Sequence, residues 1–280
     1  MMDQRKETSP AAKWKQLSEE EIREFIEKGY IVVREVFSPV LADRIILLLR
    51  AELEIDLDDK STWTGPMFML RKVFENRPFI EIHTQRYLGT LDDLCGQGRW
   101  EATMGVGHWP ILLPGFATLP WTPPKHGWHV DISLDHPRLD SPSFGLMGIE
   151  LFTDIEAGGG GTAIRVGSHC TMARILAESR SDEMTETELA RRAVSDTDHL
   201  SVIEVTGQAG DVLLMHPLTV HACSPNTRDR ARIAAVKLVN LYEPMNLKRE
   251  NPSDCSPIEQ AIVEALAQIP KKSPLSQSVV

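Results

Sequence analysis

The chain opens with a polar stretch followed by an amphipathic helical pattern. Ser18 stands three residues before Glu21, the spacing of a helix capping box. Apolar residues then recur on one helical face, at Ile22, Phe25 and Ile26. Gly29 is placed to end this helix in a left-handed turn. The pattern therefore predicts a first helix between residues 18 and 29.

The pattern changes to an extended one directly after that glycine. The run YIVVREVF at 30–37 predicts a strand, and Ser38-Pro39 opens a second helix with apolar spacing over 40–55. Residues 55–100 carry no clear period. From about residue 101 onward the chain reads as strands separated by turns.

The second half holds several apolar runs of strand length. A group of four glycines, Gly158 to Gly161, precedes one short strand, and the sequence TGQAGD separates two others. A polar insert at 171–197 interrupts the strands, and its residues 185–194 predict a helix. The other predicted strands cover residues 144–155, 199–205, 211–222 and 232–242.

Helices that come first and strands that come later indicate the α+β class. We expect N-terminal helices packed on a β-sandwich or a double-sheet barrel. The polar ends at 1–16 and 269–280 are predicted to be disordered. Residues 17–268 then form a single domain, in which the insert at 171–197 has the polarity and position of a lid.

Composition narrows the classes of protein that fit. The 280 residues carry a net charge of -10, which disfavours a nucleic-acid partner. No apolar run has membrane-spanning length, and the N-terminus lacks the apolar core of a secretory signal. The four cysteines are far apart, which argues against a disulfide framework or a zinc knuckle. These features predict a cytoplasmic protein.

The stretch KHGWHVDISLDHP at 125–137 carries the first candidate chemistry. His129 and Asp131 form a His-x-Asp pair, and on a strand both side chains point to the same face. The pair alone does not separate a metal site from two ordinary polar residues. A metal site needs a third ligand from a neighbouring strand, and His216 and His221 are the candidates.

Two histidines and one carboxylate on one octahedral face leave three positions open, the arrangement of non-haem Fe(II) oxygenases. Two open positions can take a bidentate keto acid and the third can take O2. The far carboxylate of the keto acid then needs a cation, and the fork of an arginine suits it. Arg228, Arg230 and Arg232 all follow His221, and Arg230 and Arg232 share a strand face.

At this point the sequence resembles the phytanoyl-CoA dioxygenase family of Fe(II)/2-oxoglutarate-dependent oxygenases, from about Leu17 to about Tyr242. The resemblance rests on four segments in order. These are LSEEEIREFIEKGYIVVREVFSPVLADRI, WHVD, GGGTAIRVGSH and GDVLLMHPLTVHACSPNTRDRAR.

The resemblance implies a double-stranded β-helix, or jelly roll, with the N-terminal helices on its major sheet. It implies His129, Asp131 and His221 as iron ligands, Arg232 as the partner of 2-oxoglutarate, and Thr162 as a second contact of that cosubstrate. His221 is preferred to His216 because of the following SPN and the spacing to Arg232. Arg230 remains the rival of Arg232.

Three positions depart from the family pattern. Cys223 stands where serine is common, Val166 where proline is usual, and a frequent tryptophan is replaced near Met147. Asp131 keeps the carboxylate that related halogenases lack, so the resemblance favours a hydroxylase.

The expected reaction is hydroxylation of an aliphatic C–H bond of a small molecule, with O2 consumed and with succinate and CO2 released. Desaturation, cyclisation and epoxidation are alternatives of the same chemistry. A non-catalytic jelly roll that binds metal or ligand is the alternative from another class. A zinc or manganese isomerase of cupin type would need no arginine behind the metal.

Overall fold

The computed structural model describes residues 14–131, 137–139, 145–179, 184–251 and 254–268, and every structural statement concerns these residues. Of the predicted disordered ends at 1–16 and 269–280, residues 1–13 and 269–280 lie outside them. Residues 14–16 are described. The backbone N–H groups of Lys15 and Gln16 donate to the carboxylate of Asp93, at 2.7 Å each.

The first helix, α1 (Glu19–Lys28), has the predicted cap. The Ser18 hydroxyl accepts from the backbone of Glu21, and the Glu21 carboxylate accepts from the backbone of Ser18. Gly29 closes the helix at φ 81°. The prediction for this helix is confirmed.

The strand β1 (Tyr30–Val33) is shorter than the predicted run 30–37, and the helix α2 (Pro39–Arg50) ends before the predicted residue 55. The strand ends early because Glu35 adopts φ 54° and Val36 and Phe37 donate to the carbonyl of Gly210. This turn brings the start of α2 beside a loop more than 170 residues away.

The remaining elements follow in chain order. The other strands are β2 (Met67–Phe74), β3 (Val106–Leu112), β4 (Leu146–Leu151), β5 (Thr162–Arg165), β6 (Val202–Glu204), β7 (Val212–Met215), β8 (His221–Cys223) and β9 (Ala234–Val239). The other helices are α3 (Gln85–Cys95), α4 (Ser168–Glu178), α5 (Glu186–Ser195) and α6 (Pro257–Ala267), with short 3-10 turns η1 (Lys60–Thr62) and η2 (Phe79–Ile82).

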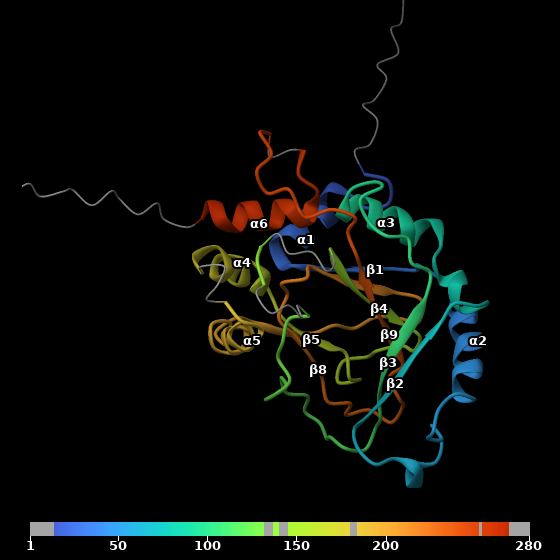
Figure 1. The fold of residues 1–280 in the computed structure, drawn as a ribbon. Helices are drawn as coiled ribbons and strands as arrows, with labels where there is room; N and C mark the ends of the chain where they lie inside the picture. Colours follow the sequence, from blue (N-terminus) through green and yellow to red (C-terminus); the bar gives the residue numbers. More distant parts are fainter. Residues whose placement is uncertain (1–13, 132–136, 140–144, 180–183, 252–253, 269–280) are drawn as a thin grey trace, which may run out of the picture.

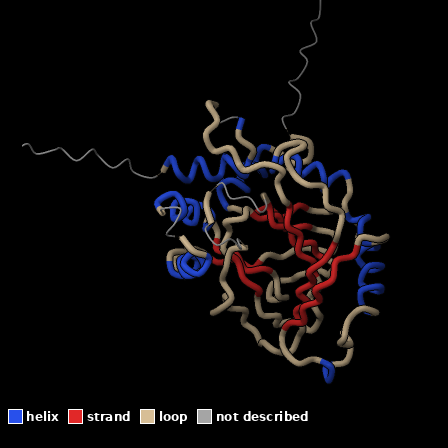
Figure 2. The backbone as a smooth tube through the Cα atoms, in the orientation of Figure 1, coloured by secondary structure: helices blue, strands red, loops and turns tan. Residues whose placement is uncertain are grey.

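The strands form a larger and a smaller sheet. The larger has the order β1-β7-β4-β9, and the antiparallel pair β2-β3 joins it because Leu112 and Arg232 form an antiparallel bridge just before β9. The smaller sheet has the order β6-β5-β8, and a bridge between His129 and His221 adds one more segment to its edge. The strands occupy the centre of the molecule in Figure 2, with helices around them.

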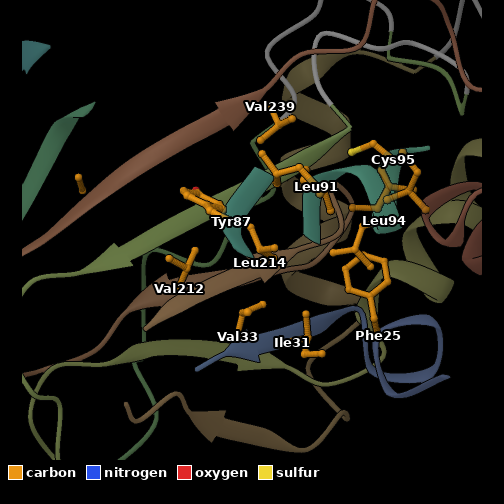
Figure 3. Close-up of a cluster of buried hydrophobic side chains, with 14 of the residues drawn as sticks. Phe25, Ile31, Val33, Tyr87, Leu91, Leu94, Cys95, Val212, Leu214 and Val239 are labelled. Atoms are coloured by element: carbon orange, nitrogen blue, oxygen red, sulfur yellow. The ribbon is translucent and has the colours of Figure 1, made fainter. Parts of the chain in front are cut away.

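One face of the larger sheet is covered by helices. Figure 1 shows α1, α3 and α6 together on one side, and Figure 3 shows side chains of α1 and α3 beside those of the sheet. Phe25 of α1, Leu91 of α3 and Leu214 of β7 share this core and are fully buried. Helices on the larger sheet were expected, and the class is α+β as predicted.

A second core lies between the two sheets. Met147 and Ile149 of β4 and Met215 of β7 contact Ile164 of β5 and Val205 in one cluster. The side chains of β5 that point the same way as Ile164 therefore face the larger sheet. We call this side of the smaller sheet its inner face.

The predicted strand 211–222 is wrong in one respect, because it is two strands. β7 ends at Met215, and Thr219 donates to the carbonyl of His216 to close a turn around Pro217. Proline lacks the N–H that a continuing strand would need. None of the described helices is both long and apolar enough to cross a membrane.

Candidate metal centre

Two chain segments 92 residues apart, at His129 and His221, meet at the edge of the smaller sheet. His129 donates its backbone N–H to the carbonyl of His221 and accepts from it in return, at 3.0 Å each way. Residues paired in this way in an antiparallel ladder point their side chains to the same face. The two imidazole rings accordingly lie side by side, with centroids 4.4 Å apart.

Backbone carbonyls orient both rings in the same sense. The Nδ1 atom of His129 is 2.7 Å from the carbonyl oxygen of Gly127, and Nδ1 of His221 is 3.0 Å from that of Thr219. A carbonyl only accepts, so each Nδ1 carries the proton and each Nε2 presents a lone pair. Fixing the tautomer through the second nitrogen is the usual arrangement of metal-binding histidines.

Asp131 completes the group from the same segment as His129. Its Oδ1 lies 3.6 Å from Nε2 of His129, and its Oδ2 lies 3.2 Å from Nε2 of His221. Oδ2 is buried without a well-formed hydrogen bond within the described structure. A carboxylate whose two oxygens face two unprotonated nitrogens fits a bound cation, which would satisfy all three side chains.

The charges of this group also fit a bound cation. Burial raises the pKa of the Asp131 carboxyl, but the interactions with His221 and His129 outweigh it and leave the pKa below its ordinary value. Burial, with a smaller contribution from His221, lowers the pKa of His129. At neutral pH Asp131 is therefore anionic and His129 neutral, the charge states that ligands of a divalent metal need.

The ligand atoms of His129, Asp131 and His221 all lie within 4.8 Å of one another. His221 is buried, whereas the side chain of His129 is 45% exposed and that of Asp131 31% exposed. The group is thus anchored in the sheet on one side and open on the other. This set can hold an octahedral metal with free positions for other ligands.

Arg232 lies on the larger sheet, just before β9. Its side chain is only 2% exposed, and Nη1 donates to the carbonyl of Pro110 at 3.1 Å. Nη2 is 3.4 Å from the hydroxyl of Thr162, and Nε has no hydrogen-bond partner in the described structure. Burial lowers the pKa of this guanidinium. Within the described residues no carboxylate pairs with it, which is rare for a buried arginine.

Thr162 places this guanidinium relative to the metal group. Thr162 lies opposite Cys223, and Ile164 lies opposite His221, in the pairing of β5 with β8. Thr162 and His221 therefore share the inner face. The three ligands and the Arg232–Thr162 pair face the same interior, as a chelated dicarboxylate would need.

The rival of Arg232 has a different setting. Arg230 is exposed, and its carbonyl accepts from the amide of Asn226. That same amide also donates to the carbonyl of Leu112, so Asn226 ties the turn to β3 and leads the chain to Arg232. The SPN segment that follows His221 therefore stabilises the turn that leads to Arg232.

The remaining histidines lie elsewhere. His216 is buried on the helix side, where its Nε2 bonds to the carbonyl of Ile258, and His169 bonds to the carbonyl of Ile26. His126 and His108 are exposed, and His108 adopts φ 56° opposite an irregularity in β2. His136 lies outside the described residues.

The glycine run makes a tight turn whose amides bind an internal anion. Gly158, Gly160 and Gly161 donate their N–H groups to the carboxylate of Glu204. A side chain at Gly161 would approach the carbonyl oxygen of Val205 to 2.0 Å, so no larger residue fits. The run is a loop closed by its own carboxylate, next to Thr162. No local pattern around Glu204 marks it as the partner of this turn.

The departures at Val166 and Cys223 have structural settings. Val166 donates its backbone N–H to the carbonyl of Ser201, a bond that proline cannot make. Cys223 is an exposed free thiol at the end of β8. All four cysteines are free, as expected from their spacing.

The fold and this group of side chains define the class of non-haem iron oxygenases, and comparison with protein families is more specific. The family model described as phytanoyl-CoA dioxygenase (PhyH) matches residues 25–234. The match spans most of the chain, and the protein belongs to this family. Its cofactors are iron and 2-oxoglutarate. A comparison with curated proteins gives no match.

Several solved structures are similar. EctD from S. alaskensis in its apo form has 18% identity and a TM-score of 0.51, covering 87% of this chain and 84% of that one. The α-ketoglutarate-dependent carbocyclase SnoK from nogalamycin biosynthesis has 20% identity and a TM-score of 0.47, covering 80% and 84%. HygX from Streptomyces hygroscopicus, with nickel and 2-oxoglutarate bound, has 14% identity and a TM-score of 0.47, covering 80% and 87%. At these identities the likeness concerns the fold alone.

Proposed function

We propose that this chain is an Fe(II)/2-oxoglutarate-dependent dioxygenase that hydroxylates an aliphatic C–H bond of a small molecule. The observation that carries the proposal is Arg232. A guanidinium this deeply buried, hydrogen-bonded to one carbonyl and one hydroxyl, is costly unless an anion joins it. The far carboxylate of 2-oxoglutarate is such an anion, and the family supplies it.

Bound iron and 2-oxoglutarate supply the oxidising chemistry, in which R–H, 2-oxoglutarate and O2 give R–OH, succinate and CO2. In our proposal His129, Asp131 and His221 hold the iron through Nε2, a carboxylate oxygen and Nε2. Arg232 and Thr162 hold the cosubstrate by its far end. The carbonyls of Gly127 and Thr219 keep both rings in the ligand tautomer.

The order of the strands supports our assignment of the fold as a double-stranded β-helix with two layers. The segment at His129, then β8, β5 and β6, form one layer, and β3, β9, β4 and β7 form the other. Ligands from the first layer and the arginine from the second then face each other across the interior. This arrangement favours chelation of a dicarboxylate over binding of a metal alone.

Asp131 favours hydroxylation over halogenation, because the carboxylate takes the metal position that a halide would need. The acidic net charge of -10 favours a small-molecule substrate over a nucleic acid. The lid role of residues 171–197 and the cytoplasmic location stay predictions.

The experiment is a screen for substrate-dependent succinate formation under 18O2. Hydroxylation puts one labelled oxygen into succinate and one into the product. Desaturation or ring closure releases labelled succinate but leaves no label in the product, which would replace the hydroxylase proposal by its closest alternative. Succinate that never exceeds the level of the Asp131→Ala variant, with any substrate or none, would favour a non-catalytic binding protein.

A further inference from the structure

The segment that carries two of the three ligands is held to the sheet at one point. Within the described residues, His129 exchanges two backbone hydrogen bonds with His221, and the chain at 122–128 runs through loop. His221, in contrast, lies in a strand that pairs with β5 over three residues. The position of His129 and Asp131 must therefore depend on side-chain contacts as well.

Those contacts lie on the outer face of the smaller sheet, behind the metal group. Because His129 lies opposite His221, the preceding Trp128 is next to Ala222, which in turn lies opposite Ala163 of β5. Both alanines are fully buried, and Trp128 is 7% exposed. Two methyl side chains in this row leave space for an indole to lie across the sheet. Its Nε1 donates to the carbonyl of Pro124 at 2.8 Å.

Arg165 closes the other side of this indole. It is the last residue of β5, its guanidinium carbon lies 4.6 Å from the centre of the Trp128 ring, and it is 7% exposed. The attraction between a cation and an indole is stronger when the pair is shielded from water, as this pair is. Among the described residues, no carboxylate forms an ion pair with Arg165.

The same guanidinium also binds the end of helix α5. Nη1 of Arg165 donates to the carbonyls of Ala193 and Val194, at 3.2 and 2.6 Å, and to the hydroxyl of Thr197 at 2.8 Å. A cation at a helix C-terminus is favoured by the helix dipole. Arg165 thus joins the insert at 171–197 to the residue that precedes His129.

We propose that Arg165 is a positioning residue for the metal centre. It fixes Trp128 against the sheet and thereby fixes His129 and Asp131 relative to His221, and it makes helix α5 part of the support of the site. This inference rests on the proposed function in that it takes these three residues to be the metal ligands. Supporting contacts of metal ligands are worth about 10- to 100-fold in affinity.

The test compares two arginines that do the same structural task. Arg174 of α4 donates to the carbonyl of Ala265 and to the amide oxygen of Gln268 at the end of α6, so it also holds a helix C-terminus. Arg165→Met and Arg174→Met are measured for the dissociation constant and visible spectrum of Co(II), and for the melting temperature of the metal-free protein. We expect Arg165→Met to bind Co(II) about 10- to 100-fold more weakly, with an altered spectrum. Arg174→Met should keep the wild-type constant and spectrum.

A second pair tests the contact through the indole. Trp128→Phe keeps an aromatic face for the guanidinium and should remain close to wild type, whereas Trp128→Leu should resemble Arg165→Met. Should Arg165→Met fail to fold, Arg165→Lys replaces it. Lysine keeps the charge but not the planar group, and we expect an intermediate affinity.

The inference is overturned if the Arg165 variants melt at lower temperature but bind Co(II) with the wild-type constant and spectrum, because the role is then structural only. If the wild type binds Co(II) and 2-oxoglutarate never joins it, the proposed function fails while the Arg165 comparison still decides this inference. If the wild type binds no divalent metal, both fail together.

Discussion

Two pairs of histidines face each other in this molecule, and they use opposite ring nitrogens. In the first pair, His129 and His221, carbonyl oxygens of the backbone engage Nδ1 and leave Nε2 open. In the second pair, His169 and His216, with ring centroids 5.4 Å apart, carbonyl oxygens engage Nε2. Nδ1 of His216 accepts from the backbone of Leu218, so this ring is fully satisfied.

The difference shows what makes a histidine a ligand in this fold. The second pair packs between helices and sheet, with no carboxylate of the described residues in contact, and burial lowers the pKa of both rings. The first pair has Asp131 between its two Nε2 atoms. The choice of ring nitrogen by nearby carbonyls, together with one carboxylate, separates a metal centre from a structural pair.

The strongest test of the comparison removes one histidine from each pair. His221→Ala should weaken metal binding by more than about 100-fold, since it removes a ligand where loss of a mere supporting contact already costs 10- to 100-fold. The 2-oxoglutarate turnover should disappear with it. His216→Gln should keep the metal affinity of the folded protein within about threefold. Isothermal titration with Co(II) measures both, and equal losses in the two variants would contradict the distinction.

The second largest effect concerns Arg232, the cation opposite the first pair. Arg232→Met should weaken 2-oxoglutarate binding by about 30-fold or more, because truncating one partner of a buried charge pair costs roughly 2–5 kcal/mol. Metal affinity without 2-oxoglutarate should not change. The exposed Arg230 supplies the matched control, and Arg230→Met should bind the cosubstrate as the wild type does. A larger loss in the Arg230 variant would assign the role to that residue instead.

The second pair predicts a loss of stability in acid. Burial lowers the pKa of His169 to about 4, below the ordinary value of 6.5. Between these two pH values the unfolded chain binds a proton at this residue and the folded protein does not. The stabilisation from this residue is fully present above pH 6.5 and is lost as the pH falls toward 4. The pKa difference corresponds to roughly 3 kcal/mol. Urea unfolding of the metal-free protein between pH 7 and 4.5 measures it.

His169→Asn provides the control for that experiment, because asparagine does not titrate in this range. The variant should be less stable at pH 7 and should lose less stability than the wild type on acidification. Parallel pH profiles of the two proteins would show that the acid sensitivity comes from other groups.

The smallest effect concerns the residue that links the two pairs. Ser168 precedes His169, and its hydroxyl accepts from the buried backbone N–H of Val220, which precedes His221. Ser168→Ala leaves that N–H without its partner and should lower the free energy of unfolding by about 1–3 kcal/mol. Metal affinity should stay within about twofold. A tenfold weaker binding of Co(II) would mean that this bond also positions the ligand.

Part of the structure could be predicted from the sequence. The local spacing of Ser18, Glu21 and the apolar residues predicted the first helix and its cap. The family resemblance named the residues of the metal group and the arginine, and separated His221 from His216. Local patterns failed where long-range contacts decide the structure. Residues 55–100 carry no clear period. β2 forms there by pairing with β3, which follows only after α3, and α3 buries one face against other parts of the chain.

Other features depend on register, which spacing does not fix. The sequence alone does not place Trp128 against the sheet. Its position beside Ala222 and Ala163 in the strand pairing shows why Arg165 can contact it. Glu204 is an ordinary strand residue until the glycine turn folds over it. The split at Pro217 was visible in the sequence, because a proline inside a predicted strand removes a donor.

We propose that His129, Asp131 and His221 hold a metal with two adjacent open positions, opposite the cation of Arg232. The most direct test is the anaerobic visible spectrum of the protein with Fe(II) and 2-oxoglutarate. We predict the charge-transfer band of a chelated keto acid, absent in His129→Ala and needing far more 2-oxoglutarate in Arg232→Ala. Bound Fe(II) without this band at saturating 2-oxoglutarate would show that the metal does not offer two adjacent positions to a keto acid.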